Sequence, residues 1–329
     1  LGDLERLAGV ASRERDALAG GGAELGALPG QALPAALPPL ALVFTGGTTR
    51  AARCVEVTHG MAVHEIRRYR DAVPLRLSGE RVLQPSSAYW GAAMLGELDV
   101  ALACGGAAVF AEVDGPEAMW EAVCQCGVTV LGVVPALLAH LPVAQARSRS
   151  RLRTILAWAD SCPAALAAAW RTAGVVVMEL LIASEYWLAL FAREAVAGPR
   201  PLYAAVGGVA WRVDAQDGEV GELWLAGPMV SPGYRGASAG DMPTAELEGV
   251  RYLRTGDLAR RVGTSLEFLG RADMMTKAAG RWVDLLALEE ALRGVPGVAD
   301  AAVLADPGLG ARPQAHVCVH AAGAASAAS

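Results

Sequence analysis

The feature that most constrains the fold is a regular alternation of apolar and helix-like segments between residues 81 and 181. Apolar runs typical of buried strands cover residues 81–84, 128–134, 154–157 and 175–181, and one more ends at Phe110. Segments with helical spacing cover residues 92–103, 116–126, 136–140 and 163–173. Strands that alternate with helices predict a parallel sheet with helices on its faces.

The regions on either side of this alternation have different textures. Residues 1–40 combine a helix-like stretch with a linker rich in proline and glycine, and residues 41–200 hold the alternating core. Between residues 201 and 272, Gly, Asp and Pro punctuate short strands, which predicts a β-rich subdomain. Residues 273–329 contain one helix, one strand and a low-complexity tail, which predicts the start of a small α+β C-terminal domain. The predicted fold class is therefore α/β, with layered parallel sheets and flanking helices.

Charge and composition exclude several classes of function. The net charge of −6 argues against nucleic acid or an anionic membrane as the main partner. No apolar run reaches the roughly 18 residues of a membrane-spanning helix. The six cysteines show no paired CxxC spacing and are expected to be reduced thiols. These features predict a cytoplasmic protein.

A loop rich in glycine and threonine follows the first apolar run. It reads Thr45-Gly46-Gly47-Thr48-Thr49, with Arg50 and Arg53 close behind. Glycines free the backbone to present its N–H groups, while hydroxyls and guanidinium groups add donors, some of them charged. Such a loop suits a polyphosphate, although its spacing is not that of a nucleotide-hydrolase loop. The alternative is a glycine-rich hairpin turn whose hydroxyls face water.

The wider stretch resembles the phosphate loop of adenylate-forming enzymes. This superfamily comprises acyl- and aryl-CoA ligases, luciferases and the adenylation domains of nonribosomal peptide synthetases. The residues that match the family loop are Phe44, Thr45, Gly47, Thr48, Thr49, Thr58 and His59. In the same register Gly46 replaces a serine and Arg53 replaces a lysine.

Three later stretches continue the resemblance. Tyr252–Leu258 reads YLRTGDL and is the strongest short match, although Thr-Gly-Asp alone would be a turn in most proteins. Residues 179–185 read ELLIASE at the family's magnesium-binding strand end, where Leu181 and Ile182 replace a tyrosine and a glycine. Trp158-Ala159-Asp160 occupies the Gly-Gly-Glu turn beside the nucleotide. Trp158 is expected either to narrow the acyl pocket or, by slight preference, to fill the core.

The resemblance implies a site for ATP and Mg²⁺. The implied catalytic residues are Arg53 and Glu185, and Glu185 is also the implied metal ligand, unless it is a solvated charge at a strand end. The implied nucleotide-binding residues are Thr45, Gly46, Gly47, Thr48, Thr49, Asp160, Ser184, Asp257 and Arg271. Asp257 and Arg271 would hold the ribose and phosphate, and Asp273 would be the hinge of a mobile, truncated C-terminal domain.

The implied function is ATP-dependent activation of a carboxylic acid as an acyl-adenylate. Transfer to a thiol would follow, from CoA or from the phosphopantetheine of a carrier-protein domain. Residues 86–90 carry no carboxylate to anchor an amine, which favours an acyl, aryl or keto acid over an α-amino acid. No family-type lysine motif follows Val303, so weak or no adenylation is expected of this chain alone. The alternative is a catalytically degenerate scaffold within a multidomain synthetase, and the match to the middle of the family fold suggests a fragment.

Overall fold

The computed structural model describes residues 38–45, 52–76, 79–85, 91–159, 162–192, 201–236, 242–278, 281–306 and 312–319. From residue 39 onward these belong to one unit, Pro39–Ser329. The predicted N-terminal helix and most of the predicted linker lie outside the described residues.

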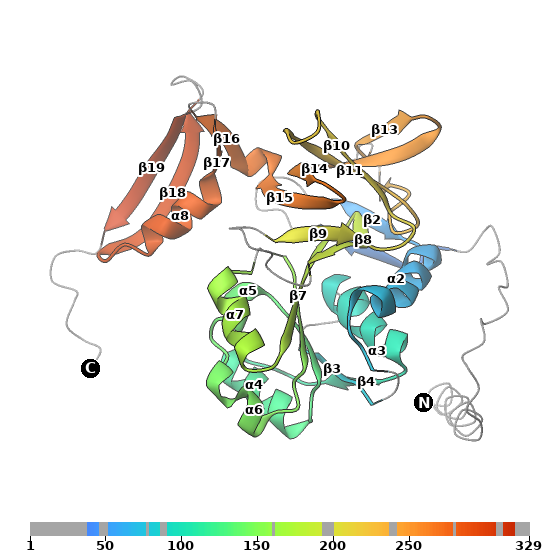
Figure 1. Cartoon of the computed structure of the whole chain (residues 1–329), viewed down its shortest axis with the longest axis vertical. Coiled ribbons are helices and arrows are strands. Elements are labelled where there is room, and N and C mark those ends of the chain that lie inside the picture. The colour runs from blue at the N-terminus through green and yellow to red at the C-terminus, as the bar shows by residue number, and fades with distance from the viewer. Residues whose placement is uncertain are drawn as a thin grey trace. The chain divides into compact units, whose positions relative to one another are not determined.

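One part of this unit is built on a parallel sheet that is flanked by helices (Figure 1). Its strands are β3 (Arg81–Gln84), β4 (Ala107–Phe110), β5 (Val130–Val133), β6 (Thr154–Ala157) and β7 (Val176–Ala183). They lie in the order β4-β3-β5-β6-β7, and every neighbouring pair is parallel. The predicted parallel sheet is therefore confirmed.

Helices connect these strands and cover both faces of the sheet. They are the π-helix η1 (Ala92–Leu98), α3 (Asp99–Cys104), α4 (Gly115–Gln125), α5 (Pro135–Leu138), the 3₁₀ turn η2 (Val143–Gln145), α6 (Ala146–Arg149) and α7 (Ala164–Thr172). A further helix, α2 (His59–Ala72), precedes the sheet; Thr58 caps it by accepting a hydrogen bond from the N–H of Met61 at 3.2 Å. The helix expected at residues 92–103 thus begins as a π-helix and becomes α-helical only at Asp99.

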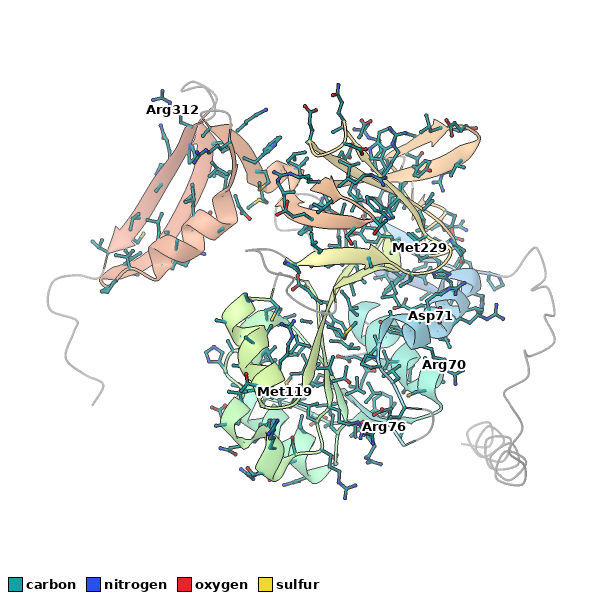
Figure 2. All side chains as sticks on the ribbon, viewed as in Figure 1. Arg70, Asp71, Arg76, Met119, Met229 and Arg312 are labelled. Carbon is teal, nitrogen blue, oxygen red and sulfur yellow. The ribbon has the colours of Figure 1, made fainter. Side chains whose placement is uncertain are left out.

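Adjacent strand residues point to opposite faces and build two separate cores. Leu83, Leu131 and Ile155 pack with α4 and α7, whereas their neighbours Val82, Val130 and Leu156 pack with α2 and α3. This follows from the period of two along a strand. Figure 2 shows the packed side chains of the first core around Met119, on α4.

Beyond β7 the sheet continues with antiparallel strands. β8 (Tyr186–Ala192) and β9 (Leu202–Ala205) extend it to β15 (Ser265–Arg271), β14 (Val250–Val262), β11 (Val220–Ala226) and β10 (Ala210–Asp214), while β13 (Thr244–Leu247) pairs with β14. A second, three-stranded sheet joins β1 (Ala41–Phe44), β2 (Cys54–Val57) and β12 (Tyr234–Arg235). A third core, which contains Met229, lies in this β-rich region (Figure 2).

The remaining elements follow the 3₁₀ turn η3 (Ala272–Met274). They are the hairpin β16–β17 (Met275–Ala278 and Arg281–Asp284), α8 (Leu285–Arg293), and the hairpin of β18 (Val298–Asp306) with β19 (Arg312–Val319). Helix α8 is tied to β18 because Arg293 bonds Asp300 at 2.8 Å and Glu289 accepts the N–H of Val303 at 2.8 Å. The α/β class with a β-rich part is therefore as predicted. The numerical domain boundaries stay predictions.

Among the described residues, no helix is long and apolar enough to cross a membrane.

Candidate functional site

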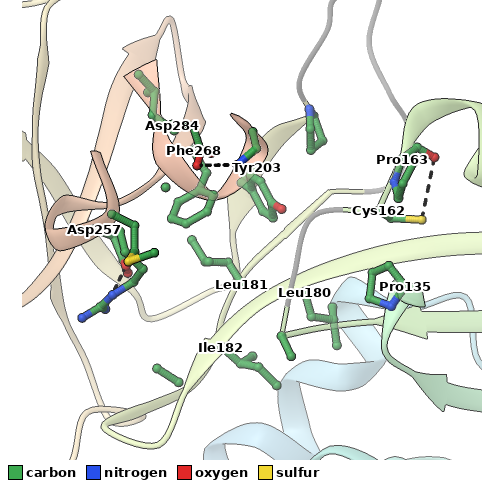
Figure 3. Close-up of a pocket in the computed structure, with 18 of the residues that line it drawn as sticks. Pro135, Cys162, Pro163, Leu180, Leu181, Ile182, Tyr203, Asp257, Phe268 and Asp284 are labelled. Atoms are coloured by element: carbon green, nitrogen blue, oxygen red, sulfur yellow. Dashed lines mark hydrogen bonds and ion pairs between the residues drawn. The ribbon is translucent and has the colours of Figure 1, made fainter. Parts of the chain in front are cut away.

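A cavity of about 670 Å³ opens where three parallel strands end (Figure 3). Its walls include residues that follow β5 and β6, such as Pro135 and Cys162, and the last residues of β7, such as Leu181. The opposite wall comes from β14 and β15, including Asp257 and Phe268. Ligands of open α/β sheets bind at the carboxyl ends of the strands, so this cavity is the best candidate site.

Asp257 and Arg271 form the polar end of the cavity. They are cross-strand partners on β14 and β15, and Nη1 of Arg271 donates to Oδ1 of Asp257 at 3.0 Å. Gly256 precedes the aspartate with a φ of +72°, a conformation that glycine adopts without strain. A Cβ at Gly256 would lie 3.3 Å from Nη2 of Arg271, so the glycine also makes room for the guanidinium.

The Asp257 carboxylate has a second donor that the sequence did not reveal. The hydroxyl of Tyr186, which lines the cavity, donates to Oδ2 of Asp257 at 3.0 Å. Asp257 is only 2% exposed. Burial raises the pKa of the Asp257 carboxyl, while the Arg271 guanidinium and the Tyr186 hydroxyl oppose that rise. The two donors thus orient the carboxyl group and offset part of the cost of its burial.

The floor of the cavity is apolar. Leu180, Leu181 and Ile182 line it along β7, and in Figure 3 they lie between Asp257 at one end and Pro135 at the other. Across from them, the rings of Tyr203 and Phe268 meet edge to face with their centroids 6.4 Å apart. Such a surface can bind a planar aromatic group.

A buried glutamate, Glu179, bonds to two residues of the cavity wall. Glu179 on β7 accepts the hydroxyl of Tyr203 and, at 3.2 Å, the backbone N–H of Cys162. Cys162 lines the cavity beside Pro163. Burial raises the pKa of the Cys162 thiol to about 11, so this cysteine is a neutral wall residue and not a thiolate nucleophile.

A second polar group lies at the turn between β7 and β8. Glu185 accepts a hydrogen bond from the Tyr234 hydroxyl at 2.9 Å, and Tyr234 in turn accepts one from Nη1 of Arg53 at 3.1 Å. Arg53 immediately precedes β2, where its backbone N–H donates to Oγ1 of Thr45 at 3.0 Å. The two ends of the glycine- and threonine-rich loop are thereby held together as a continuation of the β1–β2 hairpin.

Several residues predicted from the sequence are thus close together. Arg53 meets Thr45 directly and Glu185 through Tyr234, and Asp257 meets Arg271 directly. Nε of Arg271 also lies 3.8 Å from Asp273, which is exposed in η3. Ser184 is half-buried in the turn beside Glu185. The other predicted nucleotide-binding residues lie outside the described residues, namely Gly46, Gly47, Thr48, Thr49 and Asp160.

Trp158 is a core residue and not part of the cavity wall. Its side chain is 1% exposed and packs with the α2–α3 core. Two glycines make room for the indole. A Cβ on Gly132 would overlap Cη2 of Trp158, and a Cβ on Gly96 would lie 3.3 Å from Cζ3. Trp158 therefore fills the core, which is the preferred of the two expectations for this residue.

Comparison with known proteins agrees with the motifs. The family model described as AMP-binding enzyme matches residues 8–235. The phenyloxazoline synthase MbtB of Mycobacterium tuberculosis (strain CDC 1551 / Oshkosh) is 31% identical over 91% of this chain and 23% of its own length. The pyochelin synthetase PchE of Pseudomonas aeruginosa is 32% identical over 83% of this chain and 20% of its own length. The chain thus spans less than a quarter of either relative.

A solved structure has the same fold. The O-succinylbenzoate coenzyme A synthetase of Bacillus subtilis, in complex with ATP and a magnesium ion, superposes with a TM-score of 0.69. The match covers 85% of this chain and 60% of that chain, at 20% sequence identity.

Proposed function

The chain belongs to the AMP-binding family of adenylate-forming enzymes, and from this premise we propose that its cavity binds ATP for the activation of a carboxylic acid. The observation that carries the proposal is the Asp257–Arg271 pair at the polar end of a cavity with an apolar floor. A carboxylate that is buried and already oriented can accept hydrogen bonds from two vicinal hydroxyls, as a ribose presents. The apolar floor at Leu181 and Ile182 offers a surface for the base.

Magnesium fits the second polar group. Mg²⁺ commonly takes one or two carboxylates and completes its shell with phosphate oxygens and water. Glu185 supplies one such carboxylate, beside the Arg53 guanidinium that Tyr234 connects to it. When bound, the ion would neutralise phosphate charge. We assign Arg53 and the loop residues Thr45, Gly46, Gly47, Thr48 and Thr49 to the phosphates, with Asp160 and Ser184 as further nucleotide contacts.

The proposed chemistry has two steps. An oxygen of the acid attacks the α-phosphorus of ATP, pyrophosphate leaves, and an acyl-adenylate forms. A thiol, from CoA or a carrier protein's phosphopantetheine, then attacks the acyl carbon and AMP leaves. The protein contributes position and electrostatic stabilisation. Asp273 at η3 is the proposed hinge for a C-terminal movement between the steps, and an acyl, aryl or keto acid is the proposed substrate class.

A second candidate function is a scaffold without chemistry inside a multidomain synthetase. The specific observation in its favour is that Leu181 and Ile182 line the cavity where the family motif has a tyrosine and a glycine. Arg53 in place of lysine points the same way. The Asp257–Arg271 and Glu185–Tyr234–Arg53 groups favour a working nucleotide site instead.

Calorimetric titration with ATP, with and without Mg²⁺, separates the two candidates. We expect magnesium-dependent binding that weakens by at least about tenfold in Asp257→Ala, because a hydrogen bond to a charged group contributes about 1.5–3 kcal/mol. Asp217→Ala is the matched control, since that aspartate is exposed in the β10–β11 turn. Absence of binding by the folded wild-type chain would contradict a working nucleotide site in this chain and leave the scaffold or an incomplete fragment.

A further inference from the structure

The Tyr234 hydroxyl lies between a cation and an anion of the proposed site. It accepts from Nη1 of Arg53 at 3.1 Å and donates its proton to Oε1 of Glu185 at 2.9 Å. The Arg53 guanidinium carbon also lies 5.1 Å from the centroid of the Tyr234 ring, within cation–π range. A phenol has one proton to donate and lone pairs to accept with, so it can serve both neighbours at once.

The backbones that carry these three side chains are separately anchored. Tyr234 is on β12, which pairs with β2 directly after Arg53. The carbonyl of Glu185 accepts the N–H of Ser231 at 2.9 Å. These backbone hydrogen bonds fix the main chain near Arg53, Tyr234 and Glu185. The Tyr234 hydroxyl therefore affects only the positions of the long side chains of Arg53 and Glu185.

We propose that Tyr234 is a positioning residue that keeps Arg53 and Glu185 apart and oriented for a magnesium–triphosphate ligand. The inference rests on the proposed function and deepens it. Without the hydroxyl, a guanidinium and a carboxylate so close together would form a direct ion pair. That pair would occupy both charges, one needed for phosphate and the other for the metal.

The test compares two ligands on the whole chain by calorimetry, AMP alone and ATP with Mg²⁺. In Tyr234→Phe we expect the Kd for AMP to stay within about twofold of wild type, because AMP depends on Asp257 and Arg271. The Kd for ATP with Mg²⁺ should rise about tenfold, the effect of losing a hydrogen bond between a neutral hydroxyl and a charged group. Phenylalanine keeps the ring over Arg53. Tyr252→Phe, a change on β14 away from this group, is the matched control with no expected effect on either ligand.

Three further measurements exclude a merely structural role. The Mg²⁺ concentration for half-maximal ATP binding should rise in Tyr234→Phe, and thermal unfolding reports whether the variant is folded. If Tyr234 acts through Arg53, the double variant with Arg53→Ala should bind ATP with Mg²⁺ no more weakly than Arg53→Ala alone.

The outcomes separate this inference from the proposed function. A wild-type chain that binds neither ligand overturns both. If the wild type binds both ligands but Tyr234→Phe binds ATP with Mg²⁺ equally tightly, the nucleotide site stands and the role of Tyr234 falls. An equal loss of both ligands in Tyr234→Phe also overturns the inference, because a general disturbance of the fold would then be the cause.

Discussion

The Asp257 carboxylate still has acceptor positions for a ligand, although Arg271, Tyr186 and Thr255 already bond to it. Arg271 uses one acceptor position on Oδ1 and Tyr186 one on Oδ2, and each carboxylate oxygen has a second. The donors lock the orientation of the carboxylate before any ligand arrives. A ligand that presents two hydroxyls therefore meets a group whose conformational freedom is already lost, which reduces the entropic cost of binding.

A different set of acidic residues lies in the core and makes stability depend on pH. Glu97 is 1% exposed, with the amide of Gln84 donating to Oε2 at 2.8 Å. Burial raises the pKa of Glu97 to about 9 and that of Asp99 to about 7, and it also raises the pKa of Glu65. These groups are protonated in the folded state at pH values where the unfolded chain has already lost the protons.

The free energy of unfolding should therefore fall as pH rises, and Glu97→Gln should flatten the fall between pH 7 and 9. In the folded chain Glu97 keeps its proton up to a pKa of about 9, whereas in the unfolded chain it loses the proton near its ordinary pKa of 4.5. The stabilisation is therefore complete below the pKa of the unfolded chain and is lost as pH rises to the folded pKa. The slope removed is at most about 1.4 kcal/mol per pH unit. Urea unfolding at pH 7, 8 and 9 measures it, with the exposed Glu246→Gln as control. Parallel curves for wild type and Glu97→Gln would contradict the assignment.

At the scale of elements, the indole of Trp158 packs between strand β5 and the π-helix η1. Trp158, just after β6, lies against Gly132 of β5 and Gly96 of η1. Interiors packed at crystal-like density leave no slack for added atoms. The two glycines and the tryptophan are thus one packing unit contributed by three elements.

Gly132→Ala should destabilise the chain by about 1–3 kcal/mol, the usual cost of overpacking. The added Cβ would overlap Cη2 of Trp158 and lie 2.9 Å from Oε1 of Glu97, so the indole or β5 must shift. Gly233→Ala is the control, because no atom lies within 4 Å of its added Cβ. Chemical unfolding gives both values. Equal stability of the two variants would show that β5 and η1 adjust freely around Trp158.

The elements were predictable from the sequence where a repeating pattern defined them. β3 and β6 have the predicted limits because short apolar runs between polar residues mark buried strands. The π-helical start of η1 was not predictable, since its apolar and small residues suit either helix. β8 was missed as well. It returns antiparallel to β7 after a tight turn at Ser184 and Glu185, and its apolar sequence alone does not state the direction of pairing.

Parts of the candidate site were predictable for the same reason. Asp257 and Arg271 stand in recognisable motifs, and their contact follows from the pairing of β14 with β15. The contacts of Tyr186 and Tyr234 were not predictable, because their partners are far away in the sequence. The bond from Tyr186 to Asp257 spans 71 residues and that from Tyr234 to Glu185 spans 49. Only the fold brings such pairs together.

At the scale of the whole unit, the cavity lies where the parallel and antiparallel parts of one sheet meet. The carboxyl ends of β5, β6 and β7 supply the apolar side, while β14 and β15 supply the charged side. The proposed site therefore depends on β8 and β9, which join the two parts into a continuous sheet.

A crystal structure of the chain with AMP tests the central claim most directly. We predict density for the nucleotide in this cavity, with the two ribose hydroxyls on the Asp257 carboxylate and the base over Leu181 and Ile182. Nucleotide bound at another position, or an empty cavity at a concentration of AMP that saturates the chain in solution, would contradict the assignment of the site.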